Sequence, residues 1–436
     1  MKSIFRRIFT IFVIITTLFL NIVFPILNKQ NLNLNGNLMI FTGINSIESK
    51  LNWYYYTTTT HCVAMSSDGK YIVAGNEDGQ IYFFEESSST PLWTFSAGDN
   101  IRTISISGDG SKIIAGTDNS RVYLLNSSID ISKTEEWVHI TSGPVRSVAI
   151  SFDGKYAAAG STVISGNSLN VYNVSNIADP ILYSVNPGAT VDTLSISHYG
   201  FFIGVGCTDN NIYLYKRIQN YPEWQYNVGN YINDVILSES GFFLVAGTEN
   251  NQVLLFNVTN SVSPHIWNYT TGGHVKSVGI SEDGTYIVAG SEDNNLYLFE
   301  KSSNLTIWTK TFSHDVNKVA INDDGTFILA GENQTIHYFS VDSSNPISSN
   351  NLGDDSAIIS DLDISTSGNR YVVGADDDNF FDTFTGVYYF TNLKDNEYNG
   401  GNDPGLDLSF LWIVLPIALI IGGITVVIIY RKKKMR

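Results

Sequence analysis

The sequence predicts an all-β fold: an eight-bladed β-propeller closed by the N-terminal strand, flanked by an N-terminal signal or anchor helix and a C-terminal transmembrane helix. Three observations predict this fold. Segments built like "SVGISEDGTYIVAGSEDNNLYLFE" recur along the chain, a tight turn places glycine at eight regular positions, and a Trp-containing strand precedes the first repeat. Repetition at a fixed period of this length is typical of propellers.

The repeat period sets the number of blades. The turn glycines are Gly69, Gly110, Gly154, Gly200, Gly241, Gly284, Gly325 and Gly368, with successive glycines 41 to 46 residues apart. A period in the low forties is the length of a four-stranded propeller blade. Eight turns therefore predict eight blades.

Each repeat contains three strands in a fixed order. In the repeat around Gly284, Val278 and Ile280 belong to an apolar first strand with a small residue between them, which fits the crowded centre of a propeller. The Asp283–Gly284 pair is expected to supply the positive φ angles of a hairpin turn. "TYIVAG" then reads as a buried second strand, and "LYLFE" as a half-exposed third strand after the polar turn "SEDNN".

A fourth strand follows a polar loop and carries an aromatic residue at one phase of the repeat. Tyr183 and Ile347 are expected to substitute for Trp in two repeats, and Trp53, in "LNWYYYT", lies ahead of the first turn. We expect these rings to pack between blades as structural residues rather than to stack on a ligand. The predicted structural residues are Trp53, Trp93, Trp137, Trp224, Trp267 and Trp308.

The two ends of the array predict how the ring closes. Trp53 marks a fourth strand without three strands before it, whereas the last repeat, "RYVVGADDD…GVYYF", stops after its third strand. Pairing these two strands would complete the eighth blade and remove the exposed sheet edges.

The pattern "VRSVAISFDGKYAAAGS" resembles the WD-repeat propellers, and the regular "LWTFSAGDN"-like segments and eight-fold count resemble the quinoprotein-type propellers named for pyrroloquinoline quinone. Both resemblances cover about residues 51–391. The "GH" and "WD" dipeptides of WD repeats are nearly absent; His274, in "GGHVKS", is the one match. The quinoprotein resemblance implies a cofactor beside two adjacent cysteines, but Cys62 and Cys207 lie far apart in sequence, so redox catalysis is not expected.

The ends of the chain predict membrane attachment. Residues 1–27 read as a signal peptide or an uncleaved signal anchor, and residues 408–430 form an uncharged apolar run that is long enough to span a bilayer. The basic tail, residues 431–436, places that end in the cytoplasm. Linkers at residues 28–50 and 392–407 join these segments to a propeller at 51–391 that faces outward from the plasma membrane.

Charge narrows the expected partners. Outside the two basic ends the chain carries 17 cations and 42 acidic residues, so its surface repels nucleic acid and anionic headgroups. Basic patches on a protein, or a cell-surface polymer, remain the expected partners. Solubility alone would also account for the charge.

The strand order predicts which loops share a face. Both linkers should leave from the face of the Asp–Gly turns, so the loops of the opposite face would point away from the membrane. We predict that these loops form a binding face. The alternative explanation for their acidic and Asn-rich sequences is that Asp and Asn simply form good turns. Its acidic residues are Asp78, Asp99, Asp118, Asp209, Glu249, Glu292, Asp293, Asp315, Glu332, Asp354 and Asp355.

Two constellations suggest chemistry. The acidic segment "ADDDNFFDTFTG" offers Asp376, Asp377, Asp378 and Asp382 as oxygen ligands for calcium, although its spacing does not match an EF-hand and a solvated insertion is the alternative. The first strands also carry a mixed polar ring: His61, Arg102, Arg146, Asp192, Asn233 and Lys276.

We find no catalytic motif in the sequence, no bound cofactor is implied beyond calcium, and we expect no enzyme activity. The predicted function is a membrane-tethered platform that binds a protein or surface polymer. An enzyme with a site in the axial channel, and a scaffold for assembling membrane proteins, stay as alternatives.

Overall fold

The computed structural model describes residues 47–128, 134–164, 166–353, 357–377 and 385–394. These residues form eight four-stranded antiparallel sheets and no helix, so the predicted eight-bladed β-propeller is confirmed. Within this part of the chain, no helix could cross a membrane. The predicted terminal segments, 1–27, 408–430 and 431–436, lie outside the described residues.

The first strands of neighbouring blades contact one another around the axis of the propeller. These innermost strands are β2 (Thr60–Met65), β6 (Ile101–Ile106), β10 (Val145–Ile150), β14 (Val191–Ile196), β18 (Ile232–Leu237), β22 (Val275–Ile280), β26 (Val316–Ile321) and β30 (Ala357–Ile364). The second strands are β3 (Tyr71–Asn76), β7 (Lys112–Thr117), β11 (Tyr156–Ser161), β15 (Phe202–Cys207), β19 (Phe243–Thr248), β23 (Tyr286–Ser291), β27 (Phe327–Glu332) and β31 (Arg370–Asp377).

The outer half of each blade repeats in the same way. The third strands are β4 (Gln80–Glu85), β8 (Arg121–Asn126), β12 (Leu169–Asn173), β16 (Asn211–Lys216), β20 (Gln252–Asn257), β24 (Asn295–Glu300), β28 (Thr335–Ser340) and β32 (Gly386–Lys394). The outermost strands are β5 (Trp93–Ser96), β9 (Trp137–Ile140), β13 (Ile181–Val185), β17 (Trp224–Asn227), β21 (His265–Thr270), β25 (Thr306–Thr311), β29 (Ser348–Asn351) and β1 (Ile47–Tyr56). We number the blades 1 to 8 in this order.

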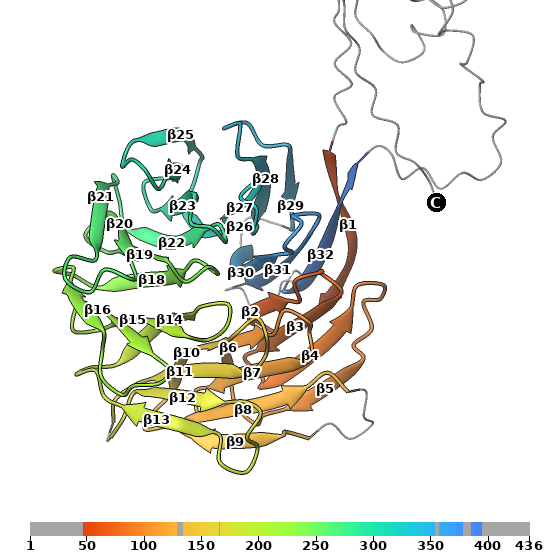
Figure 1. The fold of residues 1–436 in the computed structure, drawn as a ribbon. Coiled ribbons are helices and arrows are strands. Elements are labelled where there is room, and N and C mark those ends of the chain that lie inside the picture. Colours follow the sequence, from red (N-terminus) through yellow and green to blue (C-terminus); the bar gives the residue numbers. More distant parts are fainter. Residues whose placement is uncertain (1–46, 129–133, 165, 354–356, 378–384, 395–436) are drawn as a thin grey trace, which may run out of the picture. The chain divides into compact units, whose positions relative to one another are not determined.

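Blade 8 is assembled from both ends of the domain, as the sequence predicts. Its strand order is β30, β31, β32 and then β1, and Figure 1 shows β1 beside β32. The two strands are antiparallel, with Ile47 opposite Lys394 and Tyr56 opposite Gly386. This pairing covers the edge that β32 would otherwise expose.

The hydrophobic core is divided among the contacts between blades, which we call seams. Eight clusters of buried residues lie one to a seam, each drawing side chains from two neighbouring blades. The second strands are buried almost throughout because both of their faces pack against a neighbouring blade. Burial of this kind explains why their sequences read as continuous apolar runs.

The turn between the first and second strands differs in detail from the prediction. All eight turn glycines have φ between +66° and +75°, which a residue with a side chain adopts at a cost. The prediction that the preceding aspartate shares this conformation is wrong, since Asp283 has no positive φ. Its carboxylate instead accepts hydrogen bonds from the Thr285 N–H at 2.8 Å and the Ser281 hydroxyl at 3.0 Å.

Both ends of the described chain lie on the face of these turns, which we call the Asp–Gly face. β31 starts next to the turn at Gly368, and Arg370 pairs with Thr391 near the end of β32. Ile47 is paired with Lys394 at that same end. The loops between second and third strands, and between one blade and the next, form the opposite face.

Candidate binding surfaces

The polar ring predicted from the first strands has a common structural origin. Every innermost strand contains a β-bulge, at which one residue has no partner on the second strand. A bulge re-aims the extra side chain and is common beside binding sites. The bulged residues are His61, Arg102, Arg146, Asp192, Asn233, Lys276, Asn317 and Ser360, two more than the sequence indicated.

The cations of this ring are already paired within the protein. Arg102 forms two hydrogen bonds to Asp118, at 2.8 and 3.0 Å, and these hydrogen bonds lower the pKa of Asp118. Arg146 lies 3.0 Å from Asp192, which also accepts the Tyr231 hydroxyl. The ring is therefore a set of ion pairs rather than a row of free charges.

Several acids of the predicted binding face also have internal partners. Lys276 donates to Glu292 at 2.8 Å and lowers its pKa, and His274 lies 3.1 Å from the same carboxylate. Asp209 and Asp293 each accept a tyrosine hydroxyl at 2.6 Å, from Tyr213 and Tyr297, and each also accepts a turn N–H. Asp99 accepts the N–H of Asn100 at 2.8 Å.

Glu332 is the most enclosed member of that face. One carboxylate oxygen accepts the backbone N–H groups of Ser313 and His314, and the other lies 3.1 Å from His337 Nε2. Burial raises the pKa of Glu332, but these hydrogen bonds outweigh burial and lower the pKa overall. Glu332 is therefore part of the fold and is not available to a partner.

Three acids of the predicted face have no hydrogen bond or ion pair of their side chains among the described residues: Asp78, Glu249 and Asp315. Asp78 is exposed and the other two are half-buried, and all three belong to loops of the opposite face. Asp354 and Asp355 lie outside the described residues. The charge that this face can offer is thus concentrated on fewer residues than the sequence indicated.

The predicted structural tryptophans lie between blades. Each pairs with the fourth residue of a third strand, and the indole N–H groups of Trp53, Trp267 and Trp308 donate to carbonyls of the next blade at 2.7 to 3.0 Å. Trp224 does the same at 3.4 Å. Trp93 and Trp137 are also buried.

Of the two residues expected to replace tryptophan, Tyr183 is confirmed and Ile347 is wrong. Tyr183 occupies the tryptophan position and donates its hydroxyl to the Lys216 carbonyl at 3.0 Å. Ser348, not Ile347, occupies it in blade 7, because Ser348 pairs with Tyr338. Ile347 instead packs against the cluster between blades 7 and 8.

The predicted calcium ligands are only partly described. Asp376 lies at the end of β31, the side chain of Asp377 is not described, and Asp378 and Asp382 lie outside the described residues. Among the described side chains no group of three or more histidine, cysteine, aspartate or glutamate residues is arranged to hold a metal ion. Calcium binding by this segment stays a prediction.

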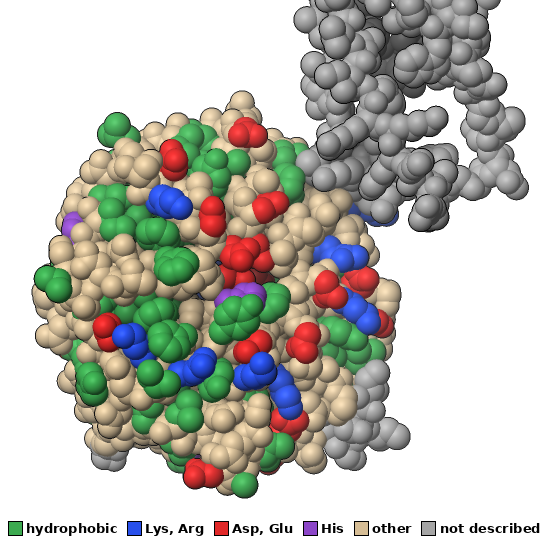
Figure 2. Space-filling model, viewed as in Figure 1, with side chains coloured by type: hydrophobic (Ala, Val, Ile, Leu, Met, Phe, Trp, Pro, Cys, Tyr) green, Lys and Arg blue, Asp and Glu red, His purple; other side chains and the backbone are tan. Residues whose placement is uncertain are grey.

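A cavity that the sequence analysis did not single out lies on the axis. It has a volume of about 440 Å³ and opens on the Asp–Gly face, where its lining includes residues just after the first strands. Figure 2 shows acidic side chains gathered at the centre of one face, beside a histidine. The acidic lining residues are Asp234, Glu239, Glu282, Asp323, Asp361 and Asp363, all from blades 5 to 8.

The mouth of this cavity carries acids whose pKa is raised. Burial raises the pKa of Glu239 and of Asp323, and their mutual repulsion raises that of Glu239 further. His198 lies 2.8 Å from Glu239 and stacks on Phe152, with ring centroids 4.1 Å apart. Lys318 is the one lysine or arginine among the lining residues, and it lies 3.6 Å from Asp361.

A signal for these residues exists in the sequence. The third and fifth positions of the first strands face the axis and usually hold small neutral residues, whereas Asp234, Lys318, Asp361 and Asp363 break that rule. Chemically, the cavity can attract cations and hold protons at carboxyls whose pKa is raised.

Comparison with known proteins agrees with the fold. Residues 54–85, 133–173, 266–300 and 307–340 match the model of the WD domain, G-beta repeat. No curated protein matches the chain. None of the matches supports the quinoprotein-like part of the resemblance.

Two solved structures are similar to this chain in fold. The structure of Chaetomium thermophilum Sqt1 bound to the N-terminus of the ribosomal protein L10 superimposes with a TM-score of 0.68 at 14% sequence identity. The superposition covers 79% of this chain and 100% of the Sqt1 chain. A second structure of the same Sqt1 gives a TM-score of 0.67 at 12% identity, with the same coverage.

Proposed function

We propose that this eight-bladed propeller of WD40 repeats is a protein-binding platform without chemistry of its own, tethered to the plasma membrane and facing outward. The observation that carries the proposal is the closed ring, which presents loops from eight blades on one rigid surface. The Sqt1 structure supports it as an example of a similar fold that binds a peptide from another protein.

The proposed tether rests on the chain ends. The apolar segments 1–27 and 408–430 would hold the protein in the membrane, with residues 431–436 in the cytoplasm. Since Ile47 and Lys394 are paired at one end of blade 8, both connections start from the Asp–Gly face. This placement supports an arrangement in which the opposite face is presented to a partner.

The proposed docking surface is the opposite face, on which Asp78 of blade 1, Glu249 of blade 5 and Asp315 between blades 6 and 7 carry the charges. These acids keep their charge for a partner because no described side chain neutralises them, unlike Asp118, Glu292 and Glu332. A partner with a basic patch fits this surface, and charge complementarity of this kind raises the association rate. A cell-surface polymer bearing cationic groups would meet the same charges.

The test is capture of a partner by crosslinking on intact cells, comparing the wild type with the triple variant Asp78→Lys, Glu249→Lys, Asp315→Lys. We expect the triple variant to lose the captured neighbour while keeping its melting temperature, because the three side chains make no hydrogen bond or ion pair among the described residues. The matched control is Asp179→Lys with Asp342→Lys, two exposed acids in loops of the Asp–Gly face. Undiminished capture by the triple variant would exclude this surface.

The axial cavity favours a second candidate, an enzyme with its site in the channel. Carboxyls whose pKa is raised by burial, such as Glu239 and Asp323, are what general acids require. Screening small cationic compounds for a rise in melting temperature that is lost in Glu239→Gln would support this candidate. The absence of any such compound leaves the platform as the function.

A further inference from the structure

The seams of the propeller are joined near the axis by hydrogen bonds from one blade to the next. At six of the eight seams in the described part of the chain, the residue after the bulge of a first strand accepts the N–H of the fourth residue of the following first strand. At four seams the acceptor is a neutral hydroxyl, 3.1 to 3.3 Å away: Thr103 to Val148, Ser147 to Leu194, Thr193 to Val235, and Ser277 to Val319. At the seam between blades 5 and 6 it is Asp234, 3.0 Å from Val278 N.

The seam between blades 8 and 1, the closing seam, uses two carboxylates instead. Asp361 accepts the Val63 N–H at 3.0 Å, and Asp363 accepts the Met65 N–H at 2.8 Å. At the position of Asp363, blades 2 and 4 have Ser105 and Ser195, which accept an N–H at 3.4 and 3.0 Å. The remaining blades have Ala64, Ala149, Ile236, Gly279 and Ala320 there, whose side chains accept nothing.

Charged groups surround these two carboxylates. Asp361 lies 3.6 Å from Lys318 of blade 7, while Asp361 and Asp323 both repel a negative charge on Asp363. Asp363 also accepts the N–H of Ile364 at 2.8 Å. The other acids lining this cavity are Asp234, Glu239 and Glu282, with His198 beside Glu239.

The surrounding protein favours a neutral Asp363. Burial raises its pKa from the ordinary 3.8 to about 7, and the neighbouring carboxylates add to that rise; together they outweigh the N–H groups of Met65 and Ile364, which favour the ionised carboxylate. A raised pKa means that the closed seam binds a proton more tightly than an open seam does. The resulting stabilisation is complete below the ordinary pKa and is lost as the pH rises through about 7.

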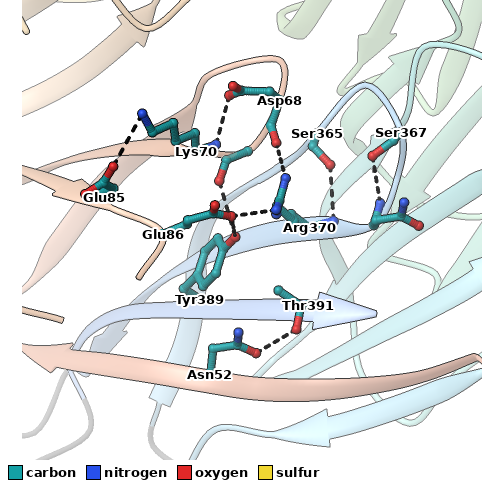
Figure 3. A network of polar contacts seen from close by, with 12 residues as sticks. Asn52, Asp68, Lys70, Glu85, Glu86, Ser365, Ser367, Arg370, Tyr389 and Thr391 are labelled. Atoms are coloured by element: carbon teal, nitrogen blue, oxygen red, sulfur yellow. Dashed lines mark hydrogen bonds and ion pairs between the residues drawn. The ribbon is translucent and has the colours of Figure 1, made fainter. Parts of the chain in front are cut away.

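The outer part of the closing seam is also polar, whereas six other seams are aromatic at the same place. Beside the turn glycine of the next blade, six blades place Tyr or Phe, for example Phe243 beside Gly284; blade 2 places Lys112 beside Gly154, and blade 8 places Arg370 beside Gly69. Figure 3 shows Arg370 bonded to the Asp68 carbonyl at 2.6 Å and to Glu86 at 2.7 Å. Tyr389 donates to the Gly69 carbonyl at 3.2 Å.

The closing seam adjoins the two ends of the described chain. Both Ile47 and Lys394 belong to blade 8, which is one of the two blades that form this seam. We propose that the seam between blades 8 and 1 is a pH-responsive opening point of the ring, held closed when Asp363 is protonated and loosened when Asp363 ionises beside Asp361 and Asp323. This inference is independent of what the platform binds.

The test is hydrogen exchange of the full-length chain at pH 6.5 and 8.5, with rates corrected for the intrinsic pH dependence of exchange. We expect opening at the Val63 and Met65 amides to rise about fourfold between these pH values. The Leu237 amide, bonded to Ser195 at the same position of another seam, is the internal reference and should show no such rise.

Variants test the contribution of the Asp363 carboxyl separately from that of the rest of the seam. Asp363→Asn keeps an oxygen that accepts the Met65 N–H but cannot ionise, so it should abolish the extra pH dependence and raise the melting temperature at pH 8.5 more than at pH 6.5. If that variant does not fold, Asp363→Ser reproduces the arrangement of Ser195 and gives the same expectation. Asp234→Asn, at the other seam with a carboxylate, should leave the Val63 and Met65 amides unchanged.

Two outcomes would overturn the proposal. One is wild-type exchange at Val63 and Met65 with the same pH dependence as at Leu237. The other is an Asp363→Asn or Asp363→Ser variant that folds and keeps the extra pH dependence.

Discussion

The indole N–H groups of Trp308 and Trp137 show how a single polar atom contributes to a seam. Trp308 donates to the Val341 carbonyl at 2.7 Å, across the seam between blades 6 and 7. Trp137 is buried at the same position of blade 2, but its Nε1 has no hydrogen-bond partner among the described residues. Trp137 is buried and Trp308 is partly buried, but only Trp308 makes this hydrogen bond.

Trp308→Phe should therefore destabilise the protein more than Trp137→Phe. The first variant leaves the Val341 carbonyl without its donor, which costs about 1 kcal/mol beyond the loss of ring area. Urea unfolding, comparing the midpoints of the two variants with the wild type, measures the difference. Equal shifts would show that the hydrogen bond contributes nothing net.

At the scale of the element, the turn between first and second strands combines a backbone requirement with a packing requirement. Gly284 has φ of +75°, and a Cβ there would lie 2.3 Å from Cδ2 of Phe243 in the preceding blade. Gly98, in the loop from β5 to β6, has φ of +78° but nothing within 4 Å of the same point. The turn glycine thus serves the seam as well as the hairpin.

Gly98→Ala should cost about 1 kcal/mol, since only the left-handed backbone conformation is penalised. Gly284→Ala should cost clearly more, because Phe243 must also move. Chemical denaturation of the two variants separates the contributions. A Gly284→Ala variant as stable as Gly98→Ala would mean that Phe243 relaxes freely.

At the scale of the whole molecule, stability depends on closure of the ring. β1 supplies the outermost strand of blade 8, and its Trp53 stacks on Tyr389 with ring centroids 5.2 Å apart. The Ser49 hydroxyl accepts a hydrogen bond from Ser348 of blade 7 at 2.6 Å, so β1 also contacts the neighbouring blade. Loss of this strand would expose the edge of β32.

Deletion of residues 47–56 should lower the melting temperature and cause association through the exposed edge, as measured by calorimetry and light scattering. A synthetic peptide of residues 47–56, added in trans, should restore both values by pairing with β32. The matched control keeps β1 and replaces only Trp53 with Phe, which should stay monomeric. A deletion variant that remains monomeric with an unchanged melting temperature contradicts this account.

The sequence by itself determined the number of blades and the closing strand. Both follow from local sequence pattern, because each repeat encodes its own strands and turn. The repeats can be counted without knowledge of long-range contacts. The phase of the tryptophans was also readable, except in blade 7, where Ser348 and Ile347 differ by one residue in register. The bulged ring was found in part because its residues lie at the same position near the start of each first strand.

The tertiary structure alone decided which charges stay available and which groups meet across the closing seam. The charges of Asp118 and Glu292 are paired with cations 16 residues away, and Asp361 and Asp363 meet the backbone of blade 1 from 298 residues away. Repeat periodicity cannot reveal such partners, because it assigns the same role to a position in every blade. The electrostatic environment of a side chain depends on the neighbouring blade that it meets, and closure brings the last blade against the first.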